Sequence, residues 1–383
     1  MTGYRFNTVP ELRVGLGAAA QIGELCVQLG VRRLMVVTDP GLVDVGLVEP
    51  VRAGAASQCE HVTVFSAVTA DPSESVVLEA LSELEADRSD GVVGLGGGSS
   101  MDVAKAIAVL ATSKQTLPDL YGVDKVAGSR LPLILIPTTA GTGSEVTPVA
   151  VITTGKTTKA GISSPVLLPD IAVIDAQLTL GLPSHVTAMT GIDAMVHAIE
   201  AYTSVVKKNP LSDMLARQAL TLLTANQRRV LSHPKDLRAR EAMLLGAALA
   251  GQAFANAPVA AVHALAYPLG GHYHMPHGLS NALMLPAVMR FNAAAAEAHY
   301  LELAALLPDD VGADVEGFVS WFELLIADAG LPTSLSAAAV PKEDLPMLAA
   351  DAMRQQRLLV NNPVEVDESA ALALYSAAWE GTR

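Results

Sequence analysis

The order of apolar segments along this 383-residue chain changes near residue 183. Before that point, short runs rich in Val, Leu and Ile alternate with longer segments of helical character. Strands that are apolar throughout and separated by helices indicate a parallel sheet with helices on both faces. After that point strand signals disappear and helical periodicity dominates. We therefore predict an α/β domain at residues 1–183 and an all-helical domain at residues 184–383.

The individual elements follow from the same pattern. Strands are expected at 33–39, 61–65, 91–95 and 131–136. Helices are expected at 18–29, 72–85, 101–111, 193–202, 212–222, 239–253, 294–306, 315–329 and 367–379. The dipeptide Pro40–Gly41 predicts a turn after the first strand. Between 146 and 174, short β-rich pieces are broken by Gly and Pro.

Composition and charge exclude several kinds of partner. A formal net charge of −14, with no basic run, argues against nucleic acid or an anionic membrane as a partner. Only Cys26 and Cys59 are present, too few for a disulfide framework or a cysteine-ligated metal. No apolar run reaches the length of a membrane span, and the first residues do not resemble a signal peptide. We therefore expect a cytoplasmic protein.

A carboxylate and an imidazole stand four residues apart in the segment 191–200. This segment has no Gly or Pro after Gly191 and is rich in Ala, Met and Ile, which indicates a helix. On a helix, Asp193 and His197 share one face, so an oxygen and a nitrogen can point to one cation. Taken alone, this spacing is typical of an ion pair within a helix.

Four of the nine histidines lie in the short segment 262–278. They are His263, His272, His274 and His277. Packing does not explain such a concentration, whereas imidazole and carboxylate groups are common ligands of divalent transition metals. Together with Asp193 and His197, this second cluster predicts a metal site that draws its ligands from both segments.

Two polar loops, 96–99 and 137–145, follow predicted strands of the α/β domain. Glycines let the backbone approach an oxyanion, which the N–H groups and dipole at a helix start attract. Ligands bind at the carboxyl ends of parallel strands in open sheets. Gly96, Gly97, Gly98 and Ser99 are therefore expected to hold a phosphate, and the hydroxyls of the second loop could hold ribose and phosphate. An ordinary tight turn and a capped turn are the alternative interpretations, since neither a Walker loop nor a GxGxxG fingerprint is present.

Two further side chains complete the predicted nucleotide site. Asp39 ends the first strong strand, where a carboxylate can accept from a ribose 2′-hydroxyl and would repel a 2′-phosphate, which favours NAD over NADP. A turn-forming Asp before Pro40 is an equal alternative. Lys159 is a candidate for contact with ribose or phosphate.

With both clusters in place, the sequence resembles the iron-containing (group III) alcohol dehydrogenases, a family of the dehydroquinate synthase-like fold. Four motifs in the family's order carry the likeness, and they lie at 96–105, 137–145, 190–202 and 263–281. The resemblance extends to at least Phe291, and beyond that residue the match is one of helices only. It implies an α/β dinucleotide-binding domain, an all-α metal-binding and catalytic domain, and an active site in the cleft between them.

The family resemblance also implies the ligands and the cofactors. In the family, iron is held by one Asp and three His, which match Asp193, His197, His263 and His277. The expected cofactor is NAD, and the family's cofactor positions match Asp39, Gly97, Gly98, Ser99, Thr138, Thr139, Thr142, Ser144 and Lys159. These donor types suit Fe(II) and Zn(II) equally, so the preference for iron comes from the family alone. The intact Asp193 looks unlike the maleylacetate reductase branch, which lacks that ligand, and the family's usual minimum is a homodimer.

One position departs from the family's pattern. Many members have a histidine where this chain has Tyr267, near the expected substrate. Tyrosine cannot serve as the same proton relay near neutral pH, because its unperturbed pKa is about 10. Either His272 or His274 substitutes, or Tyr267 shapes the pocket, or no side-chain acid is required. Tyrosine at this position also looks like the related hydroxyacid–oxoacid transhydrogenases.

We therefore predict a metal-dependent enzyme that transfers hydride between a small alcohol, or the matching aldehyde or ketone, and NAD. A transhydrogenase-like activity is the alternative on the same site. A dehydroquinate synthase-like lyase would need basic residues for a phosphorylated acid, and the segments around both metal clusters contain no Lys or Arg. A non-catalytic nucleotide-binding protein with structural histidines is the remaining alternative.

Overall fold

The computed structural model describes residues 3–155, 158–309 and 314–381 and divides the chain into two compact units. The α/β unit comprises Asn7–Thr139 and Gly143–Gly181. The helical unit comprises Met1–Phe6, Ala140–Thr142 and Leu182–Arg383. The predicted separation into functional domains at residues 1–183 and 184–383 stays a prediction.

The α/β unit is built on a six-stranded sheet in which every pairing is parallel, with the order β1-β9-β6-β4-β2-β3. Its strands are β1 (Glu11–Val14), β2 (Arg33–Val37), β3 (His61–Phe65), β4 (Gly91–Gly96), β6 (Leu133–Pro137) and β9 (Ile171–Ile174). The predicted parallel sheet is confirmed. Because the chain moves from β2 outward to β3 and then returns to β4 on the other side, the strand order reverses between β2 and β4. This reversal is the kind of position where open α/β sheets bind ligands.

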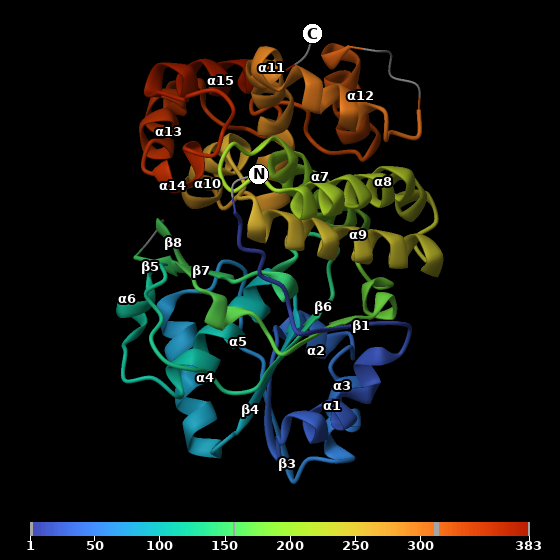
Figure 1. The fold of residues 1–383 in the computed structure, drawn as a ribbon, viewed down its shortest axis with the longest axis vertical. Helices are drawn as coiled ribbons and strands as arrows, with labels where there is room; N and C mark the ends of the chain where they lie inside the picture. The colour runs from blue at the N-terminus through green and yellow to red at the C-terminus, as the bar shows by residue number, and fades with distance from the viewer. Residues whose placement is uncertain (1–2, 156–157, 310–313, 382–383) are drawn as a thin grey trace. The chain divides into compact units, whose positions relative to one another are not determined.

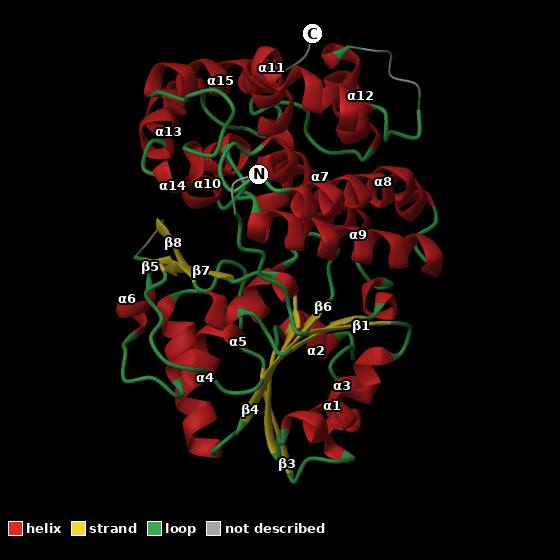
Figure 2. Cartoon of the chain, viewed as in Figure 1, coloured by secondary structure: helices red, strands yellow, loops and turns green. Residues whose placement is uncertain are grey.

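Helices cover both faces of this sheet, as Figures 1 and 2 show. Successive side chains of a strand point to opposite faces. In β2, Leu34 and Val36 therefore pack with α1 and α3, whereas Met35 and Val37 pack with α4 and α5. The helical segments of this unit are η1 (Ala18–Gln21), α1 (Ile22–Leu29), α2 (Pro40–Asp44), α3 (Glu49–Ala56), α4 (Glu74–Asp87), α5 (Gly98–Leu110) and α6 (Leu117–Leu120).

A small second sheet has the order β5-β8-β7. It consists of β5 (Gly122–Val123), β7 (Val149–Thr154) and β8 (Thr158–Ser163), and the short helices of this region are η2 (Ser144–Val146), η3 (Pro165–Leu167) and η4 (Ala176–Thr179).

Two local predictions need correction. Pro40–Gly41 opens the short helix α2 instead of a free turn, because Asp39 caps it and Pro40 suits a first helical position. The helix expected at 101–111 already begins at Gly98.

The helical unit is organised around α7, in which every residue from Gly191 to Thr203 is buried. A helix that is apolar all round belongs inside a bundle, and α7 packs against α8, α9 and α11. The unit contains α7 (Ser184–Thr203), α8 (Pro210–Ser232), α9 (Leu237–Asn256), α10 (Ala261–Tyr273), α11 (His277–Ala304), α12 (Val315–Asp328), η5 (Lys342–Asp344), α13 (Leu345–Ala352), α14 (Gln356–Leu359) and α15 (Glu368–Glu380).

Two of these helices contain prolines that the sequence pattern does not accommodate. Pro268 lies inside α10 and Pro286 inside α11.

Among the described residues, no single helix has both the length and the apolar character of a membrane span. The pair α9 and α10 meets these criteria only when joined, with a bend of 106° between the two helices.

A fully buried lysine ties α5 to the segment that follows β6. Lys105 Nζ donates to Ser144 Oγ (2.8 Å) and to the Val149 carbonyl (2.7 Å), and it lies 3.8 Å from Asp102 Oδ1. Burial has the largest effect on this amine and lowers the pKa of Lys105 to about 8. The negative charges of Asp102 and Glu145 act in the other direction and raise it. Burial likewise raises the pKa of Glu145 to about 7. Removing the amine would therefore leave the Asp102 carboxyl group buried without its nearest cation.

We expect Lys105→Met to lower the free energy of unfolding by about 3–5 kcal/mol, the usual cost of removing one member of a buried charge pair. Urea denaturation followed by circular dichroism measures this difference. The exposed Lys235 provides the matched control, and Lys235→Met should change stability by less than about 0.5 kcal/mol. Similar effects of the two substitutions would show that the buried contacts of Lys105 do not stabilise the unit.

Candidate metal centre

The helix α7 presents a carboxylate and an imidazole on one buried face. Asp193 and His197 are 2 % and 4 % exposed, and His197 Nε2 lies 3.9 Å from Asp193 Oδ1. The spacing of four residues on a continuous helix is sufficient to place them together. At 3.9 Å the contact is longer than a hydrogen bond. A direct bond within the pair therefore does not account for their arrangement.

Two more imidazoles reach the same carboxylate from α10 and α11. His263 Nε2 lies 4.0 Å and His277 Nε2 lies 3.6 Å from Asp193 Oδ1. A Cβ atom on Gly278 would lie 2.3 Å from the Met189 carbonyl oxygen of α7. Glycine at this position therefore allows the first turn of α11 to approach α7 closely, which brings His277 to the other three residues.

The four side chains fit a single divalent cation. One donor atom from each of Asp193, His197, His263 and His277 lies within 4.8 Å of the others. Donors placed about 2.1 Å from a tetrahedral ion are separated by about 3.4 Å from one another, close to the spacing seen here. Burial is the largest effect on the pKa of His197 and lowers it to about 3, although the negative charge of Asp193 acts to raise it. A neutral imidazole has a free lone pair, which is the form that binds a metal.

A second carboxylate, Glu200 of α7, orients one of these imidazoles. Its oxygens accept from His263 Nδ1 at 2.6 Å and from the Val262 amide at 2.7 Å. This contact assigns the ring proton to Nδ1, so the lone pair of His263 Nε2 faces Asp193. Glu200 was not among the residues predicted from the sequence to form the site. Its position one turn after His197 in the same helix is the signal that could have found it.

The three candidates for a proton relay occupy different positions on and after α10. Tyr267 is one turn after His263, and its ring centre lies 6.0 Å from that of His277. His272 follows His263 by nine residues, which places it on the opposite face of the helix, and its Nε2 lies 2.9 Å from Asp351 Oδ2. His274 ends α10 with a positive φ of 53° and is exposed. Of the three, Tyr267 is the side chain that lies beside the cluster.

The predicted nucleotide loops follow neighbouring strands of the sheet. Asp39 follows β2, the glycine loop 96–99 follows β4, and the loop 137–145 follows β6. Gly96 has a φ of 149°, and a Cβ atom there would lie 2.7 Å from Ser100 Oγ, so glycine is required. Gly97 is the N-cap of α5 and has no side chain that could cap its first turn. Those N–H groups have the arrangement that binds phosphate at helix starts.

Some of the predicted nucleotide contacts have protein partners. Asp39 Oδ1 accepts from the Leu42 amide at 3.1 Å, as expected of a helix cap. Lys159 Nζ lies 2.6 Å from Asp71 Oδ1.

The hydroxyls of the second loop differ in their surroundings. Ser144 Oγ donates to Asp102 and accepts from Lys105. Thr138 is buried, whereas Thr139 and Thr142 are partly exposed, and Thr142 lies in the short segment assigned to the helical unit. The nucleotide-binding roles of all these residues stay predictions.

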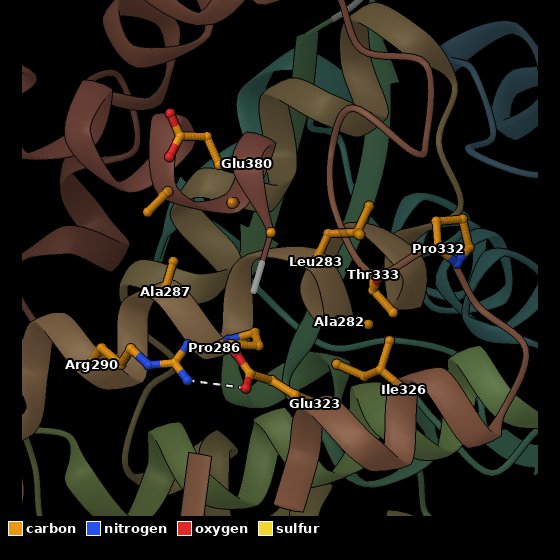
Figure 3. A pocket seen from close by; sticks show the side chains of 13 residues that line it. Ala282, Leu283, Pro286, Ala287, Arg290, Glu323, Ile326, Pro332, Thr333 and Glu380 are labelled. Carbon is orange, nitrogen blue, oxygen red and sulfur yellow. Dashed lines mark hydrogen bonds and ion pairs between the residues drawn. The ribbon is translucent and has the colours of Figure 1, made fainter. Parts of the chain in front are cut away.

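A separate cavity of about 240 Å³ lies in the helical unit (Figure 3). Pro286 and Arg290 of α11 and Glu323 of α12 line it, and Arg290 Nη1 pairs with Glu323 Oε1 at 2.5 Å. None of the predicted site residues lines this cavity, so it is not part of the metal cluster.

Comparisons with known proteins agree with this arrangement. Residues 10–176 match the model "Iron-containing alcohol dehydrogenase", and residues 187–379 match "Fe-containing alcohol dehydrogenase family, C-terminal". Long-chain-alcohol dehydrogenase 1 of Geobacillus thermodenitrificans (strain NG80-2) is 40% identical over 390 residues, which cover 100% of this chain and 98% of that protein.

Solved structures give the same assignment. A 1,3-propanediol oxidoreductase has a TM-score of 0.95 at 33% identity, over 98% of this chain and 100% of that one. Sulfoacetaldehyde reductase from Bifidobacterium kashiwanohense, in complex with NAD+, has a TM-score of 0.90 at 30% identity, over 98% of each chain. The predicted family and fold are confirmed, and the chain belongs to the iron-containing alcohol dehydrogenase family.

Proposed function

We propose that this protein is an NAD-dependent dehydrogenase of small alcohols that uses iron held by Asp193, His197, His263 and His277. The observation that carries the proposal is the convergence of one carboxylate and three imidazoles, from three helices, within 4.8 Å. The family model that covers the first half of the chain supports the assignment to alcohol oxidation. The donor set suits Zn(II) as well, and the family favours Fe(II).

The chain's own residues define how such a site would work. Asp193 and the three imidazoles would hold the cation, and Glu200 orients the His263 ring so that its free nitrogen faces the other three residues. A bound divalent cation supplies Lewis acidity, which favours loss of the substrate's hydroxyl proton. The burial of Asp193 excludes water from its carboxylate and strengthens electrostatic interactions there. Tyr267, beside His277, would shape the pocket wall and not relay a proton near neutral pH.

NAD is the proposed hydride acceptor. The N–H groups at the start of α5 would hold its phosphates, Asp39 would accept from a ribose hydroxyl, and Thr138, Thr139 and Thr142 would contact the remainder. The relative from Bifidobacterium kashiwanohense was crystallised with NAD+, which supports this choice of cofactor. A homodimer in the cytoplasm completes the proposal, and gel filtration and cell fractionation would test these two parts.

Transhydrogenation between a hydroxy acid and an oxoacid is the second candidate. The observation that favours it is Tyr267, which takes the place of a histidine common in alcohol dehydrogenases of this family and lies beside His277. In that reaction NAD would stay bound, and the oxoacid would take the hydride.

We expect the purified, iron-loaded protein to form NADH with at least one member of a panel of short alcohols, diols and hydroxy acids. Absorbance of the reduced nicotinamide measures the reaction. A parallel assay adds an oxoacid and measures the reduced product. If reduced product forms only when the oxoacid is present and no net NADH appears, the protein is a transhydrogenase and the proposed dehydrogenase activity is wrong.

We expect His277→Ala to lower kcat more than about 100-fold, because loss of a metal ligand exceeds the 10–100-fold cost of disturbing its partners. Affinity for NAD, measured by fluorescence titration, should stay nearly unchanged, since the proposed nucleotide residues follow β2, β4 and β6. His233→Ala, at an exposed histidine, is the matched control and should be active. If His277→Ala also lost affinity for NAD, the proposal that separate residues bind the metal and the nucleotide would be wrong.

We expect Asp39→Gly to raise kcat/KM with NADP and lower it with NAD, because the substitution removes the negative charge that repels a 2′-phosphate. Glycine is tolerated at a helix cap at a cost of a few tenths of a kcal/mol, so α2 should be retained. Asp44→Gly, at an exposed position of α2, controls for nonspecific effects. An unchanged ratio of the two cofactors would assign Asp39 to helix capping alone.

A further inference from the structure

An amide side chain lies among the four proposed metal ligands. Asn281 follows His277 by four residues on α11, which repeats the spacing of Asp193 and His197 on α7. Its side chain is fully buried, at 0 % exposure. Residues four apart share one helix face, so α11 presents both His277 and Asn281 to the cluster.

The amide nitrogen of Asn281 contacts three of the four residues. Asn281 Nδ2 donates to Asp193 Oδ1 at 2.6 Å, and it lies 3.2 Å from His263 Nε2 and 3.3 Å from His277 Nε2. Its oxygen, Oδ1, is buried and has no hydrogen-bond partner among the described residues. The nitrogen therefore makes all the described polar contacts of this side chain.

The surrounding groups determine which end of the amide faces the cluster. Asp193 offers a carboxylate oxygen, and His263 offers an unprotonated nitrogen because its Nδ1 proton goes to Glu200. Both are hydrogen-bond acceptors. Rotation of the amide by half a turn would place its oxygen against a carboxylate oxygen, which is repulsive. Acceptors on the cluster side thus explain why the nitrogen points inward while the oxygen is left unpaired.

We propose that Asn281 is a positioning residue of the metal centre, which holds Asp193 Oδ1 toward the three imidazoles by donating a hydrogen bond to it. The inference rests on the proposed metal-binding function. An Asp side chain has two rotatable bonds, and the bond from Asn281 fixes the direction of the carboxylate before a cation arrives. A hydrogen bond from a neutral amide to a carboxylate is stronger than one between neutral groups. Asn281 would therefore raise metal affinity without itself being a ligand.

The test uses Asn281→Leu, which is similar in size to the native residue but cannot donate. Titration of the metal-free protein with Co²⁺, followed by its visible absorption, gives both the dissociation constant and the coordination geometry. We expect the dissociation constant to rise about 10–100-fold, as for other residues that orient metal ligands. At saturation the spectrum should equal that of the native protein, because the ligands are unchanged.

The matched control is Asn292→Leu. Asn292 lies on the same helix, is 3 % exposed, and exchanges hydrogen bonds with Asn362 instead of the cluster. This substitution should leave Co²⁺ affinity unchanged even if it lowers the melting temperature. Asn281→Ala, which introduces no branched carbon, provides a second variant should the leucine variant not fold.

Each result separates the role of Asn281 from the metal centre itself. Unchanged affinity in both Asn281 variants, with native protein that binds Co²⁺, would overturn the positioning role alone. A different spectrum at saturation would overturn it in favour of Asn281 as a ligand. Equal weakening in Asn292→Leu would assign the effect to general packing and would also overturn the proposal. Failure of the native protein to bind Co²⁺ would overturn the metal centre and the inference together.

Discussion

The proposed metal centre of the helical unit is built on one carboxylate that is buried among three imidazoles. A carboxylate that is removed from water loses several kcal/mol of solvation unless other groups replace it. Asp193 is 2 % exposed, and the groups around its Oδ1 are three imidazole nitrogens and one amide. A bound cation would supply the missing positive charge. The buried helix α7, the close approach at Gly278 and the contact of Glu200 with His263 all serve to hold these donors in place.

The sequence predicted those parts of the centre that depend on a single helix. The pairing of Asp193 with His197 follows from helix periodicity alone, so a spacing of four residues was sufficient. Which of the four later histidines join them depends on how α10 and α11 pack, and only the family resemblance selected His263 and His277. His272 shows the limit, because its place on the far side of α10 could be known only once that segment was known to be helical.

The fold was predictable where burial produces a simple pattern. Strands β2, β4 and β6 are apolar on both faces, and their sequences therefore identify a covered parallel sheet. The prediction was less complete where local propensity and tertiary packing disagree. Pro268 and Pro286 are poor helix formers, yet they lie inside α10 and α11 because neighbouring helices stabilise the interrupted turns. The first residues of α11, including the proposed metal ligand His277, were missed for this reason.

The two groups of proposed site residues are held by different kinds of structure, and this difference explains how precisely each can be assigned. The proposed metal ligands are side chains on buried helices, whose backbone is fixed by packing over several turns. The proposed nucleotide-binding residues lie on loops after β2, β4 and β6, where much of the recognition would come from backbone N–H groups. Because nearly every residue has the same backbone N–H group, such contacts cannot be recognised in the sequence, except where the backbone requires glycine. Gly96, whose φ of 149° excludes other residues, is therefore more informative about this site than Ser144, whose hydroxyl bonds to Asp102 and Lys105.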